Sequence, residues 1–288
     1  MIDRFVSKLR PLLRTPQFTL SVGILLVLLI LVVFAPQLSQ WDPAKVDGSK
    51  RFDGPSATHW LGCDEFGRDI FSNLAFGARM SLLVSLSSMT LSCLVGTVLG
   101  LIAGYSRGIV EAVMMRGVDI LLSFPPILMA IFLVSLTGPS IENLILVIAI
   151  LYMPRFTRIA YSSTLAIRDS MFVESARVIG TPTWSILIRH ILPNILAPLF
   201  VQFSLGLGAA ILMESGLSFL GLGPPPPAPS WGRMISKARR FLALSPYGVL
   251  WPSLIISMTV LAFNLMGDAL RDRLDPRLRG KLGDKGEG

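Results

Sequence analysis

A polar segment between two hydrophobic stretches holds the residues whose types and spacing are most suggestive of chemistry. It reads Glu174-Ser-Ala-Arg-Val-Ile-Gly180 and is followed by His190-Ile-Leu-Pro193. Glu174 and Arg177 are three residues apart, the spacing at which an acid and a base can pair on one helix face. Gly180 fits the position just after a helix, where an unhindered backbone can adopt a left-handed conformation. The segment therefore predicts a docking surface.

Few other residues could support catalysis or metal binding. The chain has two histidines and two cysteines, and they form no ligand cluster: His59, His190, Cys63 and Cys93. We expect both histidines to be surface or capping residues and both cysteines to be unpaired thiols. The nucleotide-binding pattern G-x-x-x-x-G-K-[ST] is missing, because the Gly280-Lys281 pair has no upstream glycine at the required spacing. We therefore expect no catalytic residue, metal or cofactor on this chain.

The composition is that of a membrane protein. Hydrophobic residues make up 52% of the chain and charged residues 15%, whereas soluble domains average about 25% charged residues. The net charge of +8 could suggest nucleic-acid binding, but the basic residues lie mostly beside apolar stretches, where membrane topology explains them better. We predict an all-α polytopic membrane protein that contacts lipid and no nucleic acid.

Six stretches are long and apolar enough to cross a bilayer, which takes about 20 residues. They are Leu20–Leu38, Leu82–Tyr105, Val110–Leu136, Ile141–Tyr161, Ile195–Gly216 and Tyr247–Met266. Pro125-Pro126 interrupts the third and Pro154 the fourth, which neighbouring helices can accommodate. The first stretch is interpreted as an uncleaved anchor, because its apolar core is long and no A-x-A-like cleavage site follows. With the tail before it, this anchor makes up residues 1–38.

The distribution of Lys and Arg predicts that both termini are cytoplasmic. In that orientation 17 of the 26 basic residues lie inside and nine outside. Residues 39–79 then form a polar extracytoplasmic loop, and residues 269–288 a cytoplasmic tail. The second outer segment, Leu217–Pro246, contains Gly223-Pro-Pro-Pro-Pro-Ala-Pro-Ser-Trp231. This run favours a stiff polyproline II connector, with a surface for an external partner as the less favoured alternative.

The segment between the fourth and fifth stretches, residues 162–194, is predicted to form a helix, a glycine turn and a short helix. Apolar residues recur at helical spacing from Leu165 to Ile179. We expect Thr181 to cap the next helix, with Pro182 at its first position, and Pro193 to stop or bend it. The alternative interpretation is an amphipathic loop held at lipid headgroups.

Ionisable residues are rare within the apolar stretches, and each is by default a functional hypothesis. Arg116 and Asp119 are at helix-neighbour spacing and are expected to pair. Glu214, near the outer end of the fifth stretch, is the candidate for lining a translocation path.

Several motifs resemble one family. Glu174-Ser175-Ala176, then Gly180 and Ile191-Leu192-Pro193, resemble the EAA motif of permease subunits in bacterial ABC importers, with Ser175 in place of the usual alanine. Leu61-Gly-Cys-Asp-Glu-Phe-Gly-Arg-Asp69 and Gly77-Ala-Arg-Met-Ser-Leu82 resemble a signature of C-type permeases in the dipeptide, oligopeptide and nickel group, with Cys63 replacing threonine. Segments that also look like this group are Gly216–Gly223, Trp231-Gly232 and Gly267–Arg277.

The resemblance implies a type I (MetI-like) importer core over residues 80–268, with five of the six spans and a cytoplasmic coupling helix. It implies that five residues couple to the ATPase: Glu174, Ser175, Ala176, Arg177 and Gly180. The implied partners are a second, B-type permease, two ATP-binding subunits that hold ATP and Mg, and an extracytoplasmic solute-binding protein. The implied location is the bacterial inner membrane. The implied cargo is a di- or oligopeptide, although nickel chelates and other solutes stay open.

Two other classes are considered. A secondary transporter driven by an ion gradient favours inverted repeats and midplane ion sites at broken helices, and the two halves of this sequence show no convincing repeat. A polytopic membrane enzyme would need clustered His, Asp or Glu at a membrane surface, and the sequence lacks such a cluster. An importer permease remains the prediction, with the secondary transporter as its alternative.

Overall fold

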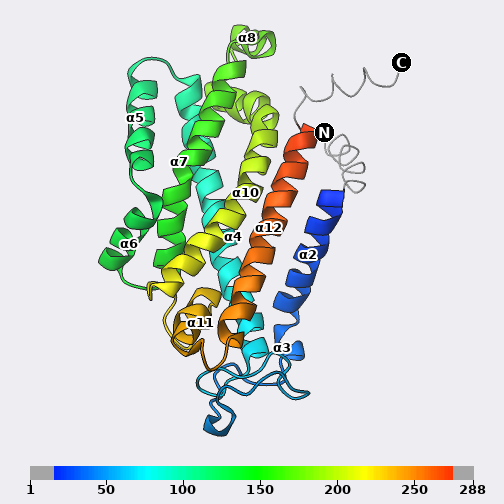
Figure 1. Ribbon diagram of the computed structural model, residues 1–288. Coiled ribbons are helices and arrows are strands. Elements are labelled where there is room, and N and C mark those ends of the chain that lie inside the picture. Colours follow the sequence, from blue (N-terminus) through cyan, green and yellow to red (C-terminus); the bar gives the residue numbers. More distant parts are fainter. Residues whose placement is uncertain (1–15, 275–288) are drawn as a thin grey trace.

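The computed structural model describes residues 16–274, in which the regular structure is helical. The helices form an elongated bundle, with α8 at one end and the loops before α4 at the other (Figure 1). Following the predicted orientation, we name these the inner and the outer end. The expected cytoplasmic N-tail up to Thr15, and the tail from Asp275 onward, lie outside the described residues.

Helical elements follow one another along residues 16–274. In chain order they are α2 (Pro16–Val33), α3 (Ala35–Leu38), η2 (Gly48–Lys50), α4 (Ile70–Tyr105), α5 (Ile109–Ser123), α6 (Pro126–Thr137), α7 (Ile141–Ile167), α8 (Met171–Val178), α9 (Thr183–Ser185), η3 (Ile186–Ile191), α10 (Leu192–Phe219), α11 (Trp231–Ala238), η4 (Arg239–Phe241) and α12 (Tyr247–Leu274).

Five helices in the described range are long and apolar enough to cross a membrane: α2, α4, α7, the continuous stretch Thr183–Phe219, and α12. The expected third span is broken into α5 and α6, which meet at an angle of 93°. Pro125 lies at the break and Pro126 begins α6, because proline cannot donate to the preceding turn and disfavours a helical residue before it. The expected count of six spans therefore holds only if this bent pair is one span.

α4 begins twelve residues before the expected span, at Ile70 rather than Leu82. Asp69 caps it by accepting a hydrogen bond from the Ser72 backbone N–H at 2.7 Å, and the first turns bury Ile70 and Leu74. The last ten residues of the expected outer loop 39–79 are therefore helical. A prediction based on hydropathy missed these first turns of α4 because they contain polar residues.

The predictions for the inner end of α10 were wrong in two details. Pro182, not Thr181, occupies the N-cap position of α9, and no side chain caps it. Pro193 does not stop the helix, because helical structure is continuous from Thr183 to Phe219; the predicted alternative, a bend at Pro193, stays a prediction. The turn before Pro193, Ile186–Ile191, is a π-helix, and such a widened turn accommodates the proline ring and its missing N–H.

α11 occupies part of the segment that was expected to be a connector. Ser230 caps it by accepting a hydrogen bond from the Arg233 backbone N–H at 3.4 Å. Trp231 is fully buried, and its indole N–H donates to the Leu74 carbonyl of α4 at 3.0 Å. Gly232 lies so close to the Ser215 carbonyl that a Cβ would be 2.0 Å from it. The Trp-Gly pair therefore packs this short helix between α4 and α10.

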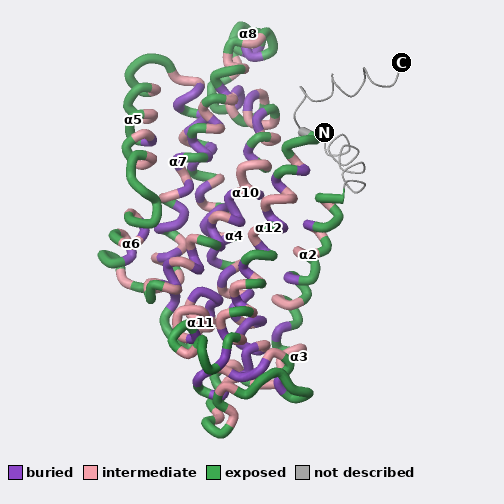
Figure 2. Tube along the Cα trace, viewed as in Figure 1, coloured by how far each residue is buried: buried purple, intermediate pink, exposed green. Residues whose placement is uncertain are grey.

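A row of three glycines on α4 allows α7 to approach closely. A Cβ at Gly96 would lie 2.7 Å from Phe156 Cβ, at Gly100 2.5 Å from Ala160 Cβ, and at Gly104 2.7 Å from Thr164 Cβ. Small residues at four-residue spacing allow membrane helices to pack backbone against backbone. The contact between α4 and α7 forms part of the buried core, which runs along the centre of the bundle (Figure 2).

Candidate functional site

α8 is a short helix at the inner tip of the bundle (Figure 1). Only Val173 and Ala176 are buried among its eight residues. These two side chains are three residues apart, so they lie on one helix face and hold α8 against the bundle. The other six residues of α8 are exposed (Figure 2). The segment predicted to be a docking surface is therefore a projecting knob, a short helix of which one face is buried.

The outward face of α8 carries Met171, Glu174, Ser175 and Val178, which share a face because they recur at three- and four-residue spacing. Met171 is 86% exposed and Val178 81% exposed. Ile179 and Trp184, which follow α8, are also exposed large apolar residues. Contiguous exposed apolar side chains mark interaction surfaces. The structure thus groups Glu174 and Ser175 with apolar residues that the motif alone did not single out.

Arg177 points toward the bundle, so the predicted Glu174–Arg177 pair was wrong. Its guanidinium donates to the Tyr105 hydroxyl at 2.8 Å and to the Arg168 carbonyl at 3.2 Å, and it lies over the Tyr105 ring. Its nearest carboxylate is that of Asp169, at 3.8 Å. Arg177 therefore fastens α8 to the inner end of α4, and Glu174 is left free for an external contact.

The junction between α7 and α8 is tied to the turn after α4 by charged groups. Arg168 donates to the Gly104 and Ser106 carbonyls at 3.0 and 3.1 Å. Arg107 pairs with Asp169 at 2.7 Å. These contacts tie the base of α8 to the inner ends of both α4 and α7.

Gly180 ends α8 in the left-handed conformation, with φ of +77°, as the sequence predicted. The Gly180 N–H donates to the Arg177 carbonyl, and the Thr181 N–H to the Ala176 carbonyl, each at 3.0 Å. These are the two hydrogen bonds of a Schellman motif, which reverses the chain at a helix end. The reversal leads directly into the long helix that contains α10.

Replacing Gly180 by alanine is expected to destabilise this turn by about 1 kcal/mol, because left-handed backbone is unfavourable for a residue with a Cβ. No atom lies within 4 Å of the added Cβ, so the cost is conformational and not steric. Hydrogen exchange of residues 171–185 should become faster in Gly180→Ala and stay unchanged in the matched variant Gly117→Ala, where the added Cβ also meets no atom. Unchanged exchange in both variants would contradict the conformational role of Gly180.

The two acidic residues of α5, Glu111 and Asp119, have partners on α7. Asp119 pairs with Arg158 at 2.5 Å, so its predicted pairing with Arg116 was wrong. Tyr161 donates to the Glu111 carboxylate at 2.5 Å. The spacing in the sequence suggested that Asp119 pairs with Arg116 within one helix. In the folded chain Asp119 pairs with Arg158 of α7 instead.

Glu214 is fully buried between α4 and α10. Its carboxylate accepts hydrogen bonds from the Ser81 hydroxyl at 2.8 Å and the Ser218 hydroxyl at 2.7 Å. Hydrogen bonding of this kind is what a buried carboxyl group requires. Its role in a translocation path stays a prediction, and exposure to a path would require α4 and α10 to separate at this level.

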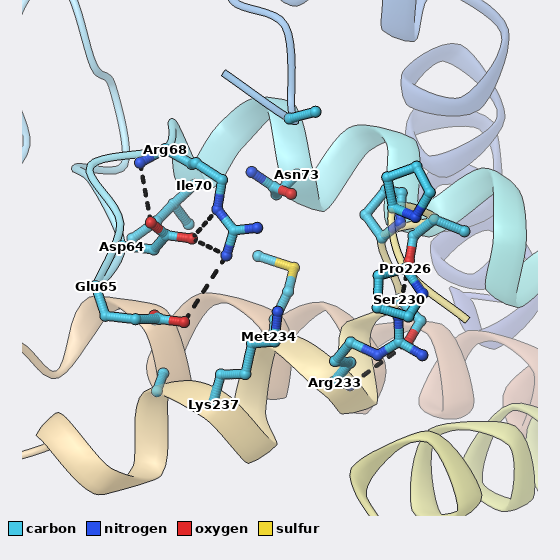
Figure 3. A pocket seen from close by; sticks show the side chains of 16 residues that line it. Asp64, Glu65, Arg68, Ile70, Asn73, Pro226, Ser230, Arg233, Met234 and Lys237 are labelled. Carbon is cyan, nitrogen blue, oxygen red and sulfur yellow. Dashed lines mark hydrogen bonds and ion pairs between the residues drawn. The ribbon is translucent and has the colours of Figure 1, made fainter. Parts of the chain in front are cut away.

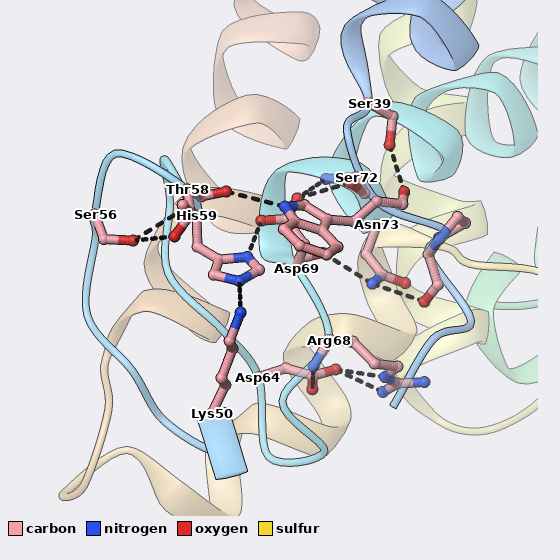
Figure 4. A network of polar contacts seen from close by, with 12 residues as sticks. Ser39, Lys50, Ser56, Thr58, His59, Asp64, Arg68, Asp69, Ser72 and Asn73 are labelled. Carbon is pink, nitrogen blue, oxygen red and sulfur yellow. Dashed lines mark hydrogen bonds and ion pairs between the residues drawn. The ribbon is translucent and has the colours of Figure 1, made fainter. Parts of the chain in front are cut away.

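The signature Leu61–Asp69 folds into a tight loop at the outer end (Figure 4). The Asp64 carboxylate accepts from the Arg68 side chain at 2.8 Å and from two backbone N–H groups. Gly67 has φ of +70°, and a Cβ there would lie 1.7 Å from the Asp47 carbonyl. The motif therefore has a structural role, because it positions Asp69 to cap α4.

His59 is buried, so its expected surface position was wrong. Its Nδ1 lies 3.0 Å from the Asp69 carboxylate and its Nε2 3.2 Å from the Lys50 ammonium, and its ring stacks on Trp41 (Figure 4). Cys63 is a buried free thiol, and burial, with the Asp69 carboxylate adding, raises its pKa to about 11. Cys63 is therefore protonated at neutral pH and serves to pack the loop.

A cavity of about 210 Å³ lies at the outer end, between this loop, the proline run and α11. Asp64, Glu65 and Arg68 line one side, and Arg233 and Lys237 of α11 line the other (Figure 3). Burial raises the pKa of Glu65 and lowers that of Lys237. Pro226, Pro227 and Pro229 also line the cavity. The run predicted to be a connector thus borders a charged pocket, and its contact with an external partner stays a prediction.

Comparisons with known proteins agree on one family. Residues 96–280 match the family described as binding-protein-dependent transport system inner membrane component. The chain is 44% identical over 260 residues to the dipeptide transport system permease protein DppC of Alkalihalophilus pseudofirmus, covering 90% of this chain and 86% of that protein. It is 42% identical over 261 residues to the glutathione transport system permease protein GsiD of Pectobacterium atrosepticum, covering 90% and 87%.

A solved structure has the same fold. A chain of the MetNI methionine ABC transporter, in an inward-facing conformation, superimposes with a TM-score of 0.58 and 16% identity, covering 70% of this chain and 96% of that chain. At this identity the likeness concerns the fold alone.

Proposed function

The chain belongs to the family of binding-protein-dependent transport system inner membrane components, and on that premise we propose that it serves an importer of di- or oligopeptides. It is a multi-pass permease subunit of an ABC importer in the bacterial inner membrane. The cargo proposal is supported by relatives that are named for dipeptide and glutathione transport. Both named cargoes are small peptides that carry free carboxylates.

α8 is proposed to be the coupling helix that docks on an ATP-binding subunit. The observation that carries this proposal is the outward face of α8, where Glu174 and Ser175 lie among exposed apolar side chains on a firmly anchored helix. Ala176 and Arg177 anchor the helix, and Gly180 turns the chain into the 37-residue stretch Thr183–Phe219. Movement of the docked knob would then tilt α7 and α10 as levers, a common route to alternating access.

The proposed assembly has four further chains. A second, B-type permease forms the other half of the pathway, and two ATP-binding subunits hold ATP and Mg. An extracytoplasmic solute-binding protein delivers cargo at the outer end, and one of the two ATP-binding subunits docks on the other permease. The absence of a Walker A pattern from this sequence supports ATP hydrolysis on separate subunits. Glu214 is proposed to border the path when α4 and α10 separate.

Reconstitution tests the proposed function. The complete importer in proteoliposomes, with ATP inside and peptide-loaded binding protein outside, is expected to accumulate a labelled dipeptide. Omission of ATP or of the binding protein should stop uptake. The rival interpretation, an ion-gradient-driven transporter, expects uptake by this chain alone under a proton or sodium gradient. Such uptake, or an importer that carries no peptide, would refute the proposal.

A further inference from the structure

Two polar contacts join α5 to α7 in the inner half of the bundle. Tyr161 and Arg158 of α7 are matched by Glu111 and Asp119 of α5. The next cation along α7, Arg155, has no such counterpart. It shares an open pocket with Leu122 of α5, which carries no charge.

Arg155 makes no ion pair or side-chain hydrogen bond with residues 16–274. Its guanidinium lies 5.1 Å from the centre of the Tyr152 ring and is exposed. Arg155 also lies near the middle of α7, a helix long and apolar enough to cross the membrane. A cation at such a position is unfavourable unless it faces a water-filled space or a partner, and it therefore marks a functional site.

The pocket beside Arg155 has the size and lining of a small-molecule site. Its volume is about 440 Å³, within the range of about 300–1,000 Å³ that is usual for ligand pockets. Apart from Arg155 and Arg158, Gln202 of α10 supplies the polar group, and Leu122, Ile159 and Leu205 supply apolar surface. A cation and an amide beside apolar side chains match the C-terminal end of a small peptide, where a carboxylate adjoins a side chain and a neutral peptide bond.

We propose that Arg155, with Gln202, forms a transient site for the C-terminal carboxylate of the peptide as it crosses the membrane. This inference rests on the proposed function. Arg158 differs from Arg155 because its charge is already neutralised by Asp119. Arg158 would therefore keep α5 and α7 together, and Arg155 would be the cation that is free to bind an anion. Guanidinium is suited to this role because it can donate two parallel hydrogen bonds to a carboxylate.

Uptake by the complete importer in proteoliposomes tests the proposal, with tritiated alanyl-alanine as cargo and loaded binding protein at saturation. Arg155→Gln is expected to lower uptake by about tenfold, since a charge-assisted hydrogen bond contributes this much. ATP hydrolysis stimulated by the binding protein should stay within about twofold of wild type, so that transport per ATP falls. Arg155→Lys, which keeps the charge, should retain most uptake. Arg116→Gln, at an exposed cation of α5 that does not line the pocket, should retain all of it.

Three results would overturn the proposal. Wild-type uptake in Arg155→Gln would show that the cation does not act on cargo. Loss of the second permease from the purified Arg155→Gln complex would show that Arg155 pairs with that subunit instead. A defect confined to vesicles containing phosphatidylglycerol would assign the guanidinium to lipid phosphate. A wild-type importer that carries no peptide would instead refute the proposed function, and with it the premise of this inference.

Discussion

Glu174→Arg is expected to detach this permease from its ATP-binding subunits without unfolding it. Glu174 is exposed on the outward face of α8 and makes no ion pair within residues 16–274, so its reversal removes no contact on which the described fold depends. Placing a like or unpaired charge in a docked interface costs about 2 kcal/mol or more, which weakens association by about 30-fold or more. Co-purification with the ATPase and ATP-driven uptake should both be lost.

Two further variants separate a docking defect from a general effect of charge. Val178→Asp changes a side chain that is 81% exposed on the same face and should also weaken ATPase association. Glu142→Arg makes the same reversal in the first turn of α7, at the outer end, and should leave ATPase association intact. If Glu174→Arg kept full association and uptake, α8 would not be the docking element.

Gly100→Leu is expected to prevent the bundle from assembling. A Cβ at Gly100 would lie 2.5 Å from both Ala160 Cβ and the Thr157 carbonyl, so the new side chain would push α4 and α7 apart. Overpacking typically lowers the free energy of unfolding by about 1–3 kcal/mol. We expect a loss of about 3 kcal/mol or more for Gly100→Leu, because the backbone atoms that the new side chain meets cannot move aside. The measurement is the yield of monodisperse permease after detergent extraction, together with its melting temperature.

Gly23→Leu is the matched control, because it makes the same change in a membrane-length helix where a Cβ would meet no atom within 4 Å. This variant should be extracted and melt like wild type. Normal yield and melting of Gly100→Leu would show that α4 and α7 do not pack closely at Gly100.

Hydropathy and turn chemistry were sufficient for the placement of most helices. A membrane-length apolar run has few alternatives to a helix, since every backbone group in lipid must be hydrogen-bonded internally. Hydropathy did not predict the ends of two helices, where capping and local backbone geometry decide how far the helix extends. α4 extends outward through the polar turns after Asp69, and helix formation continues past Pro193 because a π-helical turn precedes it. The break at Pro125-Pro126 follows from proline chemistry, but its angle of 93° is not predictable from the local sequence.

Spacing predicted the conformation of Gly180 but not the partners of the charged residues. A left-handed glycine is a local requirement of a helix end, so neighbouring residues suffice to predict it. Arg177 binds Tyr105 and Asp119 binds Arg158, contacts between residues far apart in the chain. Helix spacing can say which residues share a face, but long side chains select their partners from all elements within reach.

The sequence by itself determined that this protein is a helical membrane protein with an EAA-like segment between its fourth and fifth apolar stretches, because composition, hydropathy and local motifs act over short distances. Only the tertiary structure decided which side of α8 is free. It buries Val173 and Ala176, turns Arg177 onto α4 and leaves Glu174 outward. It also decided that Arg155 stands unpaired beside a pocket while Arg158 does not. Both outcomes depend on helices that meet across long separations in the chain, where packing, not spacing, sets the neighbours of each charge.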